Sequence, residues 1–364
     1  MARILRKANL NRIIMGATFL GAGGGGSAEH GRALLNELEN PEITLVSPED
    51  MSSHEYAVMI AAIGAPRIIK ERGFGSEALE AFKHVVALSK AGGRKIAYLM
   101  SGEMGGFNTL VPIYVAAKED VPVVDADGNG RAVPELLTTL YSISEISLNP
   151  LVIANADGDI ATFYLSDPTD HAKAEKLARV MATAWNMSAA FATWIVNKDN
   201  ILTSLVPGCI TKAEKIGEVF EKLQEKLGFV ELTSKLRSLG AVELFIGTIE
   251  SLEYQTVGGF DFGTTRIHGE DRYKNLEMLV FFKNENIIAQ IGGNIIAMVP
   301  DIISLVDLEK LVPITNADTY EDQKVAVYGL KAPETWLKSS HGFERWKHVL
   351  KTMGYEGNYI ALKS

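Results

Sequence analysis

The chain has 364 residues and a single cysteine, and 45 acidic residues against 36 lysines and arginines give a formal net charge of −9. This length suits one large or two ordinary domains, and one cysteine rules out a disulfide framework within a chain. The acidic balance argues against a nucleic-acid partner, which needs a basic face. The sequence has no secretory signal and no apolar run of the ~18 residues that a membrane helix needs. We therefore expect a cytoplasmic protein with no membrane partner.

The first 165 residues alternate between apolar strands and helices. In residues 76–93 the apolar side chains recur at helical spacing, Ser76 can cap the first turn and two glycines follow the last. The other expected elements are strands at 42–46, 56–64, 94–102 and 121–128, a helix at 108–120 and a hairpin at 152–165 around Asp157-Gly158. This alternation predicts a parallel sheet covered on both faces.

The pattern changes near Asp167-Pro168. We expect a long helix at 171–194, a second helix at 211–228 and mostly strands from 241 to about 330, then a helix at 343–353 and a last strand at 358–362. The predicted architecture is an α/β domain over residues 1–167 followed by a β-rich α+β domain over residues 168–364.

Four consecutive glycines stand near the start of the chain, and three residues form a G-x-G-x-x-G pattern at Gly21, Gly23 and Gly26. A dinucleotide-binding site needs a strand before this pattern and a helix after it. Residues 10–20 fit a helix as well as a strand, so the pattern alone is a weak signal. Two other interpretations stay open: backbone N–H groups that accept an anion, or a tightly packed crossing without a ligand. We expect the run to line the main pocket through Gly23, Gly24, Gly25 and Gly26.

Two polar clusters follow predicted strands, at residues 101–108 and 125–135. Ligands of open parallel sheets bind beyond the carboxyl ends of the strands, so both clusters are expected at one edge. Asp125 and Asp127 are two residues apart and would share one face of an extended segment. Burying so many charges without a partner is costly, which favours a binding site over a simple turn, although the turn remains an alternative. The expected catalytic residues are Asp127, Glu103, Arg131 and Asp125, and Asn108 and Glu135 are expected to bind substrate.

Three further residues draw attention. His268 in the second half, and His30 beside the glycine run, are each either a surface histidine or a proton donor or metal ligand. No paired histidine spacing is present, so a divalent metal is left open and no cofactor is expected. Cys209 follows Pro-Gly and is expected to be a core residue rather than a nucleophile.

Three stretches carry a resemblance: "LGAGGGGS", "GEMGGFNTLVPIYVAAKEDVPVVDADGNGRAVPELLTT" and "GGFDFGTTRIHG". The chain resembles the S-methyl thiohydantoin desulfurase-like family over essentially its whole length, from about residue 9 to residue 344. The resemblance implies a Rossmann-like N-terminal domain, a β-rich C-terminal domain and cleavage of a carbon–sulfur bond on a thiohydantoin ring. In one departure, Ser27-Ala28 stands where the family usually has Asp-Pro, which removes a carboxylate from the mouth of the site.

The expected reaction is hydrolysis, with Asp127 or Glu103 as the base that activates water. Arg131, Asn108 and glycine N–H groups would hold the ring, and His268 would reach the substrate from the second domain. Two alternatives remain: a non-catalytic accessory subunit of a hydantoinase-like enzyme, and an NAD(P)-dependent oxidoreductase. The expected partners are a small heterocyclic substrate, further copies of this chain in a homo-oligomer, and a hydantoinase-like protein.

Overall fold

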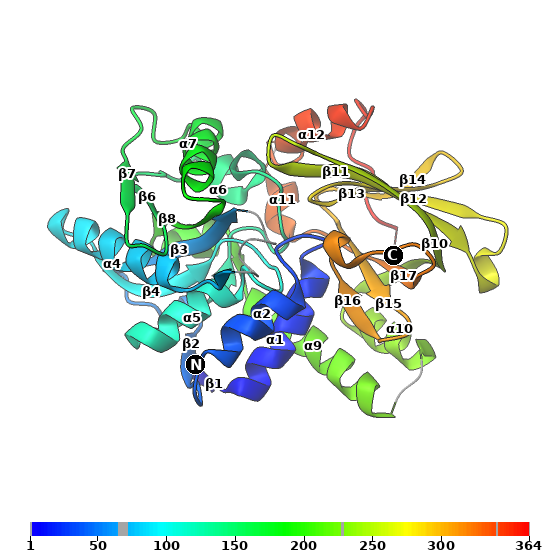
Figure 1. Ribbon diagram of the computed structural model, residues 1–364, viewed down its shortest axis with the longest axis horizontal. Helices are drawn as coiled ribbons and strands as arrows, with labels where there is room; N and C mark the ends of the chain where they lie inside the picture. The colour runs from blue at the N-terminus through cyan, green and yellow to red at the C-terminus, as the bar shows by residue number, and fades with distance from the viewer. Residues whose placement is uncertain (1, 65–71, 227–228, 340, 364) are drawn as a thin grey trace.

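The fold was analysed in a computed structural model that describes residues 2–64, 72–226, 229–339 and 341–363. Two β-sheets lie side by side, and helices α1 (Lys7–Leu20), α2 (Ala28–Asn36) and α9 (Cys209–Lys226) lie along the junction between them (Figure 1). Among the described residues no helix is both long enough and apolar enough to cross a membrane. The chain is thus a mixed α/β protein of two domains, one built on each sheet.

The first sheet is mixed rather than parallel throughout. Its strands run in the order β1-β2-β5-β4-β3-β8-β6-β7, with β9 paired to β5. The four strands β2, β5, β4 and β3 pair in parallel, as the sequence predicts, and antiparallel strands extend this group at both sides. The strands are β1 (Arg3–Leu5), β2 (Ile43–Val46), β3 (Glu55–Gly64), β4 (Lys95–Ser101), β5 (Val123–Asp127), β6 (Leu151–Ala154), β7 (Ile160–Phe163), β8 (Ser188–Val196) and β9 (Val206–Pro207).

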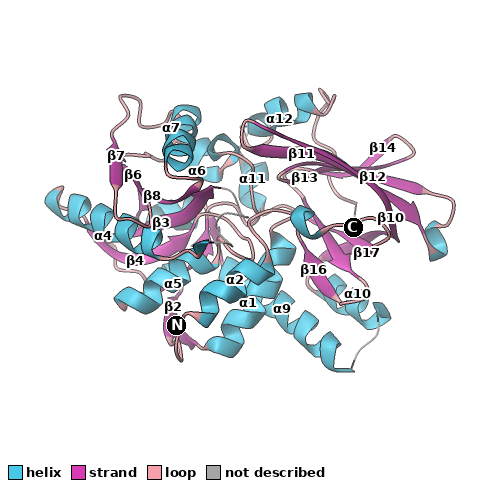
Figure 2. Cartoon of the chain, in the orientation of Figure 1, coloured by secondary structure: helices cyan, strands magenta, loops and turns pink. Residues whose placement is uncertain are grey.

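Helices cover both faces of this sheet (Figure 2). On β3, Val58 and Ile60 pack into the core beneath α4, whereas Ala57 and Met59 pack into the core beneath α7. Alternate side chains of a strand point to opposite faces, so a strand buried on both sides reads as one apolar run. The helices are α4 (Ser76–Ala91), α5 (Leu110–Glu119), α6 (Leu140–Ile143), α7 (His171–Ala184) and α8 (Lys198–Ser204), with short 3-10 turns η1 (Pro48–Asp50) and η2 (Leu136–Thr138).

The predicted long helix at 171–194 is wrong in its second half. Helix α7 ends at Ala184, Asn186 and Met187 take positive φ values of 57° and 63°, and β8 follows. Every residue of β8 is buried, between β3 and β6. The predicted hairpin at 152–165 is confirmed as the antiparallel pair β6 and β7.

The second sheet is antiparallel throughout its described strands, which confirms the β-rich pattern after residue 240. Its order is β14-β13-β12-β11-β10-β17-β15-β16. The strands are β10 (Ala241–Val257), β11 (Phe260–Gly269), β12 (Glu277–Lys283), β13 (Glu285–Ile291), β14 (Asn294–Met298), β15 (Ile302–Asp307), β16 (Val312–Ile314) and β17 (Lys324–Leu330). Around it lie α10 (Phe229–Ser238), α11 (Glu334–Lys338), α12 (Lys347–Thr352), η3 (Asp271–Tyr273), η4 (Asn316–Asp318) and η5 (Glu344–Trp346). The last strand expected at 358–362 is absent: this described segment is irregular.

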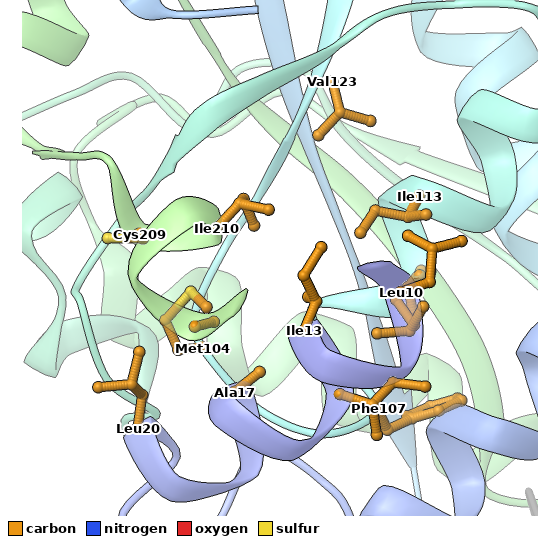
Figure 3. Close-up of a cluster of buried hydrophobic side chains, with 14 of the residues drawn as sticks. Leu10, Ile13, Ala17, Leu20, Met104, Phe107, Ile113, Val123, Cys209 and Ile210 are labelled. Carbon is orange, nitrogen blue, oxygen red and sulfur yellow. The ribbon is translucent and has the colours of Figure 1, made fainter. Parts of the chain in front are cut away.

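A close helix crossing joins the two halves of the chain. In Figure 3, Ile13 and Ala17 of α1 face Ile210 at the start of α9. A Cβ on Gly16 would overlap the carbonyl of Ala213, and a Cβ on Gly217 would overlap the carbonyl of Arg12. Glycine is therefore required where each helix meets the backbone of the other.

Candidate active site

The loop after β4 carries a carboxylate that two donors hold in place. The Asn108 amide donates to Glu103 Oε1 at 2.6 Å, and the Val133 backbone N–H donates to Glu103 Oε2 at 2.9 Å. Glu103, Asn108 and Val133 are each half-buried residues. Both oxygens of the carboxylate are fixed, one by a donor from the loop after β4 and the other by a donor from the loop after β5.

Burial raises the pKa of Glu103 to about 7, against the opposing effects of the Val133 N–H, Asn108 and the positive charge of Arg131. The nearby charge of Glu175 raises this pKa further. A carboxyl group with a pKa near neutrality exchanges a proton readily at physiological pH, as a general base must.

The glycine run contacts the loop after β4. The backbone N–H groups of Phe107 and Asn108 donate to the Gly25 carbonyl at 3.3 and 3.1 Å. A Cβ on Gly25 would come within 2.6 Å of Gly105 Cα and 3.3 Å of the Ala132 side chain, so the run also touches the loop after β5.

The same run is also held by the second domain. The Asn286 N–H donates to the Ala22 carbonyl at 2.7 Å, and the Asn316 N–H donates to the Gly23 carbonyl at 2.9 Å. The run follows helix α1 rather than a strand, so the strand–glycine–helix order of a dinucleotide site is not present here. The glycines form a tight crossing between domains, in which Gly24 lies against Glu285 and Gly26 against Phe107.

Ser27 ends the run and begins α2. Its hydroxyl accepts the His30 backbone N–H, and it also shares a hydrogen bond of 2.9 Å with His30 Nδ1. The Ser27 side chain therefore caps the start of α2. His30 lies beside Phe107 at the edge of a small cavity of about 70 Å³, and the glycine run is not among the residues that line it.

Asp125 and Asp127 share one side of β5, as predicted, and both contact the first turn of α9. Asp125 accepts the Thr211 N–H at 3.0 Å, whereas Asp127 accepts the Gly130 N–H at 2.7 Å and the Cys209 thiol at 2.9 Å. Asp127 is fully buried, and burial raises its pKa to about 7. Asp125 thus anchors the start of α9, and Asp127 is enclosed by protein.

Arg131 braces the two domains. Its fully buried guanidinium donates to the backbone carbonyls of Ala132, Pro300, Asp301 and Asn286, at 2.7 to 3.2 Å. Five N–H donors directed at four carbonyls leave little capacity for a substrate, so the contacts of Arg131 are those of a structural residue.

Glu135 forms a second bridge between the domains. Its carboxylate pairs with the Lys283 ammonium from β12, and its Oε2 lies 2.6 Å from His348 Nε2 on α12. Lys283 is buried, which lowers its pKa to about 8. Lys283 and His348 thus occupy the Glu135 carboxylate, which the sequence predicts to bind substrate.

His268 does not lie with these residues. Its side chain is exposed on β11, where it pairs with Thr248 of β10 and Glu277 of β12. Among the described residues there is no group of three His, Cys, Asp or Glu side chains that could hold a metal ion.

Sequence reasoning missed the residues that β12 and β13 contribute, above all Glu285, Asn286 and Lys283. All three are buried, and the Glu285 carboxyl lies against Gly24. The signal was present: a lysine and a glutamate interrupt the apolar run "LVFFKNENIIA", where a buried charge needs a reason.

A solved structure shares the fold. It is the X-ray crystal structure of a protein from Chromobacterium violaceum, with 24% sequence identity and a TM-score of 0.86, and the match covers 99% of this chain and 100% of that one. No curated protein matches the chain. The N-terminal domain model of the S-Me-THD-like family matches residues 8–164, and the C-terminal domain model matches residues 169–360. The chain therefore belongs to the S-Me-THD-like family, the S-methyl thiohydantoin desulfurase-like family that its sequence resembles.

Proposed function

We propose that this chain hydrolyses a carbon–sulfur bond on a thiohydantoin-type ring, with Glu103 as the general base. The observation that carries the proposal is Glu103 itself: a carboxylate held by Asn108 and the Val133 N–H, whose pKa burial raises to about 7. The family's name supports the substrate class. The four parallel strands that end at this edge support a Rossmann-like first domain.

The chemistry follows from these groups. Water attacks the ring carbon that bears sulfur, and Glu103 accepts a proton from the water as the new carbon–oxygen bond forms. The Asn108 Oδ1 atom is buried without a hydrogen-bond partner among the described residues, so it is available to accept a ring N–H.

The test is thiol release from S-methyl thiohydantoins, with thiohydantoins and hydantoins as comparison substrates. Glu103→Gln keeps the side chain's size and its bond from Val133 but removes the base, so release should fall ~10²–10⁴-fold while the melting temperature is retained. His268→Gln is the matched control, because His268 is exposed and away from these contacts, and it should keep the wild-type rate. Wild-type turnover in Glu103→Gln would refute Glu103 as the base.

A second candidate is the accessory subunit of a hydantoinase-like enzyme. It is supported by a groove of about 480 Å³ on the second sheet, whose lining combines large side chains such as Tyr254, Phe262 and Met353 with polar ones such as Glu253 and Gln255. Exposed aromatic and apolar side chains that gather beside polar ones are typical of interaction surfaces. If the wild-type chain releases no thiol alone but raises the turnover of a hydantoinase, and Tyr254→Asp abolishes that effect, this candidate replaces the first.

A further inference from the structure

Glu285 places a second carboxyl group at the glycine run, from the other domain. It is the first residue of β13 and is only 3% exposed. Its Oε1 occupies the space that a Cβ on Gly24 would fill, so Gly24 must be glycine for this carboxyl to fit. Its Oε2 is buried and has no hydrogen-bond partner among the described residues.

Three charged groups face Glu285, and two of them are already engaged. Arg131, from the loop after β5, donates to four backbone carbonyls, and Lys283, from β12, pairs with Glu135. The third is Glu103, from the loop after β4, and its negative charge disfavours ionisation of Glu285. Burial first, and Glu103 second, raise the pKa of Glu285 well above its usual range. Glu285 therefore stays protonated at a pH at which Glu103 exchanges its proton.

We propose that Glu285 is a catalytic acid that works with Glu103, so that each domain supplies one carboxyl group to the same reaction. Two interacting carboxyls in a low-dielectric site commonly hold one proton between them, which provides a base and an acid at the same pH. This inference rests on the proposed carbon–sulfur hydrolysis and assigns the proton donor that it requires.

The two groups return to their starting states in one turnover. Water adds to the ring carbon as Glu103 takes one of its protons, and the C=N electron pair moves to the ring nitrogen, which takes the proton of Glu285. In the second step the new hydroxyl returns its proton to Glu285, the carbonyl forms and the carbon–sulfur bond breaks. The departing sulfur takes the proton from Glu103. Water and the S-methyl thiohydantoin are thereby converted to methanethiol and the hydantoin.

The pH profile of thiol release separates this role from a structural one. The wild-type profile should be bell-shaped, falling at low pH as Glu103 gains a proton and at high pH as Glu285 loses one. Glu285→Gln should lower the maximum ~10²–10⁴-fold and remove the high-pH decline while keeping the low-pH decline. Glu243→Gln is the matched control: its carboxylate is also buried in the second domain, but it pairs with Arg272. A Glu285→Gln variant that keeps both declines would overturn the inference.

Two further measurements keep the inference testable apart from turnover. Infrared spectra at pH 8 should show a protonated carboxyl band in the wild-type chain that Glu285→Gln lacks. An unchanged band in that variant would overturn the inference even if thiol is released. Gly24→Ala should push the Glu285 carboxyl aside and alter the high-pH decline as Glu285→Gln does. If the wild-type chain releases no thiol yet the band is present, the proposed reaction fails and the protonation of Glu285 stands.

Discussion

The thiol of Cys209 donates a hydrogen bond to Asp127 Oδ1 at 2.9 Å, across 82 residues of sequence. Asp127 ends β5 and Cys209 begins α9, so this bond ties the sheet edge to the helix that packs on α1. Both side chains are buried, and the second oxygen of Asp127 has no hydrogen-bond partner among the described residues. The pair is a polar contact that is closed to solvent.

Cys209 should be unreactive in the folded protein. Burial, together with the charge of Asp127, raises its pKa well above the usual range, and reagents attack the thiolate rather than the thiol. A colorimetric thiol titration at pH 8 should detect no thiol in the native chain and one after denaturation. Because the chain has one cysteine, every thiol counted is Cys209. Rapid labelling of the native chain would instead show that Cys209 is reactive and can act as a nucleophile.

Asp127 should make the protein less stable as pH rises. Burial raises its pKa to about 7 in the folded chain, so between about pH 4 and pH 7 the folded state holds a proton that the unfolded state has lost. The contribution of Asp127 to the free energy of unfolding should therefore fall across this window, by up to about 4 kcal/mol at ~1.4 kcal/mol per pKa unit, and stay level above it.

Asp127→Asn removes this titration and keeps an oxygen for the Gly130 N–H and the Cys209 thiol. Urea unfolding at pH 5 and pH 8 should show a smaller difference in the variant than in the wild type, with the contribution of Glu103 remaining in both. Equal differences would mean that Asp127 is ionised throughout this range.

Arg131→Lys should destabilise the fold rather than weaken substrate binding alone. A lysine ammonium cannot donate to four carbonyls spread over two domains, and the unsatisfied carbonyls would stay buried. We expect a loss of about 3 kcal/mol or more in the free energy of unfolding. The control is Arg266→Lys, at a half-exposed pair with Glu277, where about 1 kcal/mol or less is expected. A stable Arg131→Lys variant with a raised KM would restore the substrate-binding role.

Gly16→Ala should destabilise the α1–α9 crossing, because the new Cβ would overlap the Ala213 carbonyl. Alanine favours a helix by about 1 kcal/mol over glycine, but overpacking against backbone commonly costs about 1–3 kcal/mol, so a net loss is expected. Gly92→Ala is the control: its φ is −83° and its Cβ would meet no atom closer than 3.5 Å. Thermal melts of both variants test this, and equal melting temperatures would argue against the close crossing.

Local patterns predicted the elements whose signal is local. The helix at 76–93, the hairpin around Asp157-Gly158 and the strand-rich second half all follow from spacing and turn residues. Residues 185–194 were misassigned because a strand buried on both faces has the same apolar composition as a buried helix. Strand direction could not be predicted either, since the antiparallel pairing of β3 with β8 depends on a segment that follows more than 120 residues later.

The candidate site likewise contains residues that local sequence patterns locate and one residue that they do not. Glu103, Asn108 and the glycine run come together because they lie near strand ends and helix starts, which sequence rules locate. Glu285 joins them only through the packing of one domain on the other. The pattern marked Glu285 as an unusual charge in an apolar run, but its partner, Gly24, lies more than 250 residues earlier in the sequence.

The position of β8 has a practical consequence for dividing the chain. This strand follows Pro168, yet it lies between β3 and β6 in the first sheet, and β9 adds to β5. A fragment that stops at residue 167 would leave the backbone groups of β3 and β6 unpaired along facing edges, and such edges recruit strands from other molecules. Limited proteolysis or split-protein complementation should therefore divide the chain after residue 207, so that β8 and β9 stay with the first sheet. Helix α9, which follows this position, still packs on α1 of the first fragment.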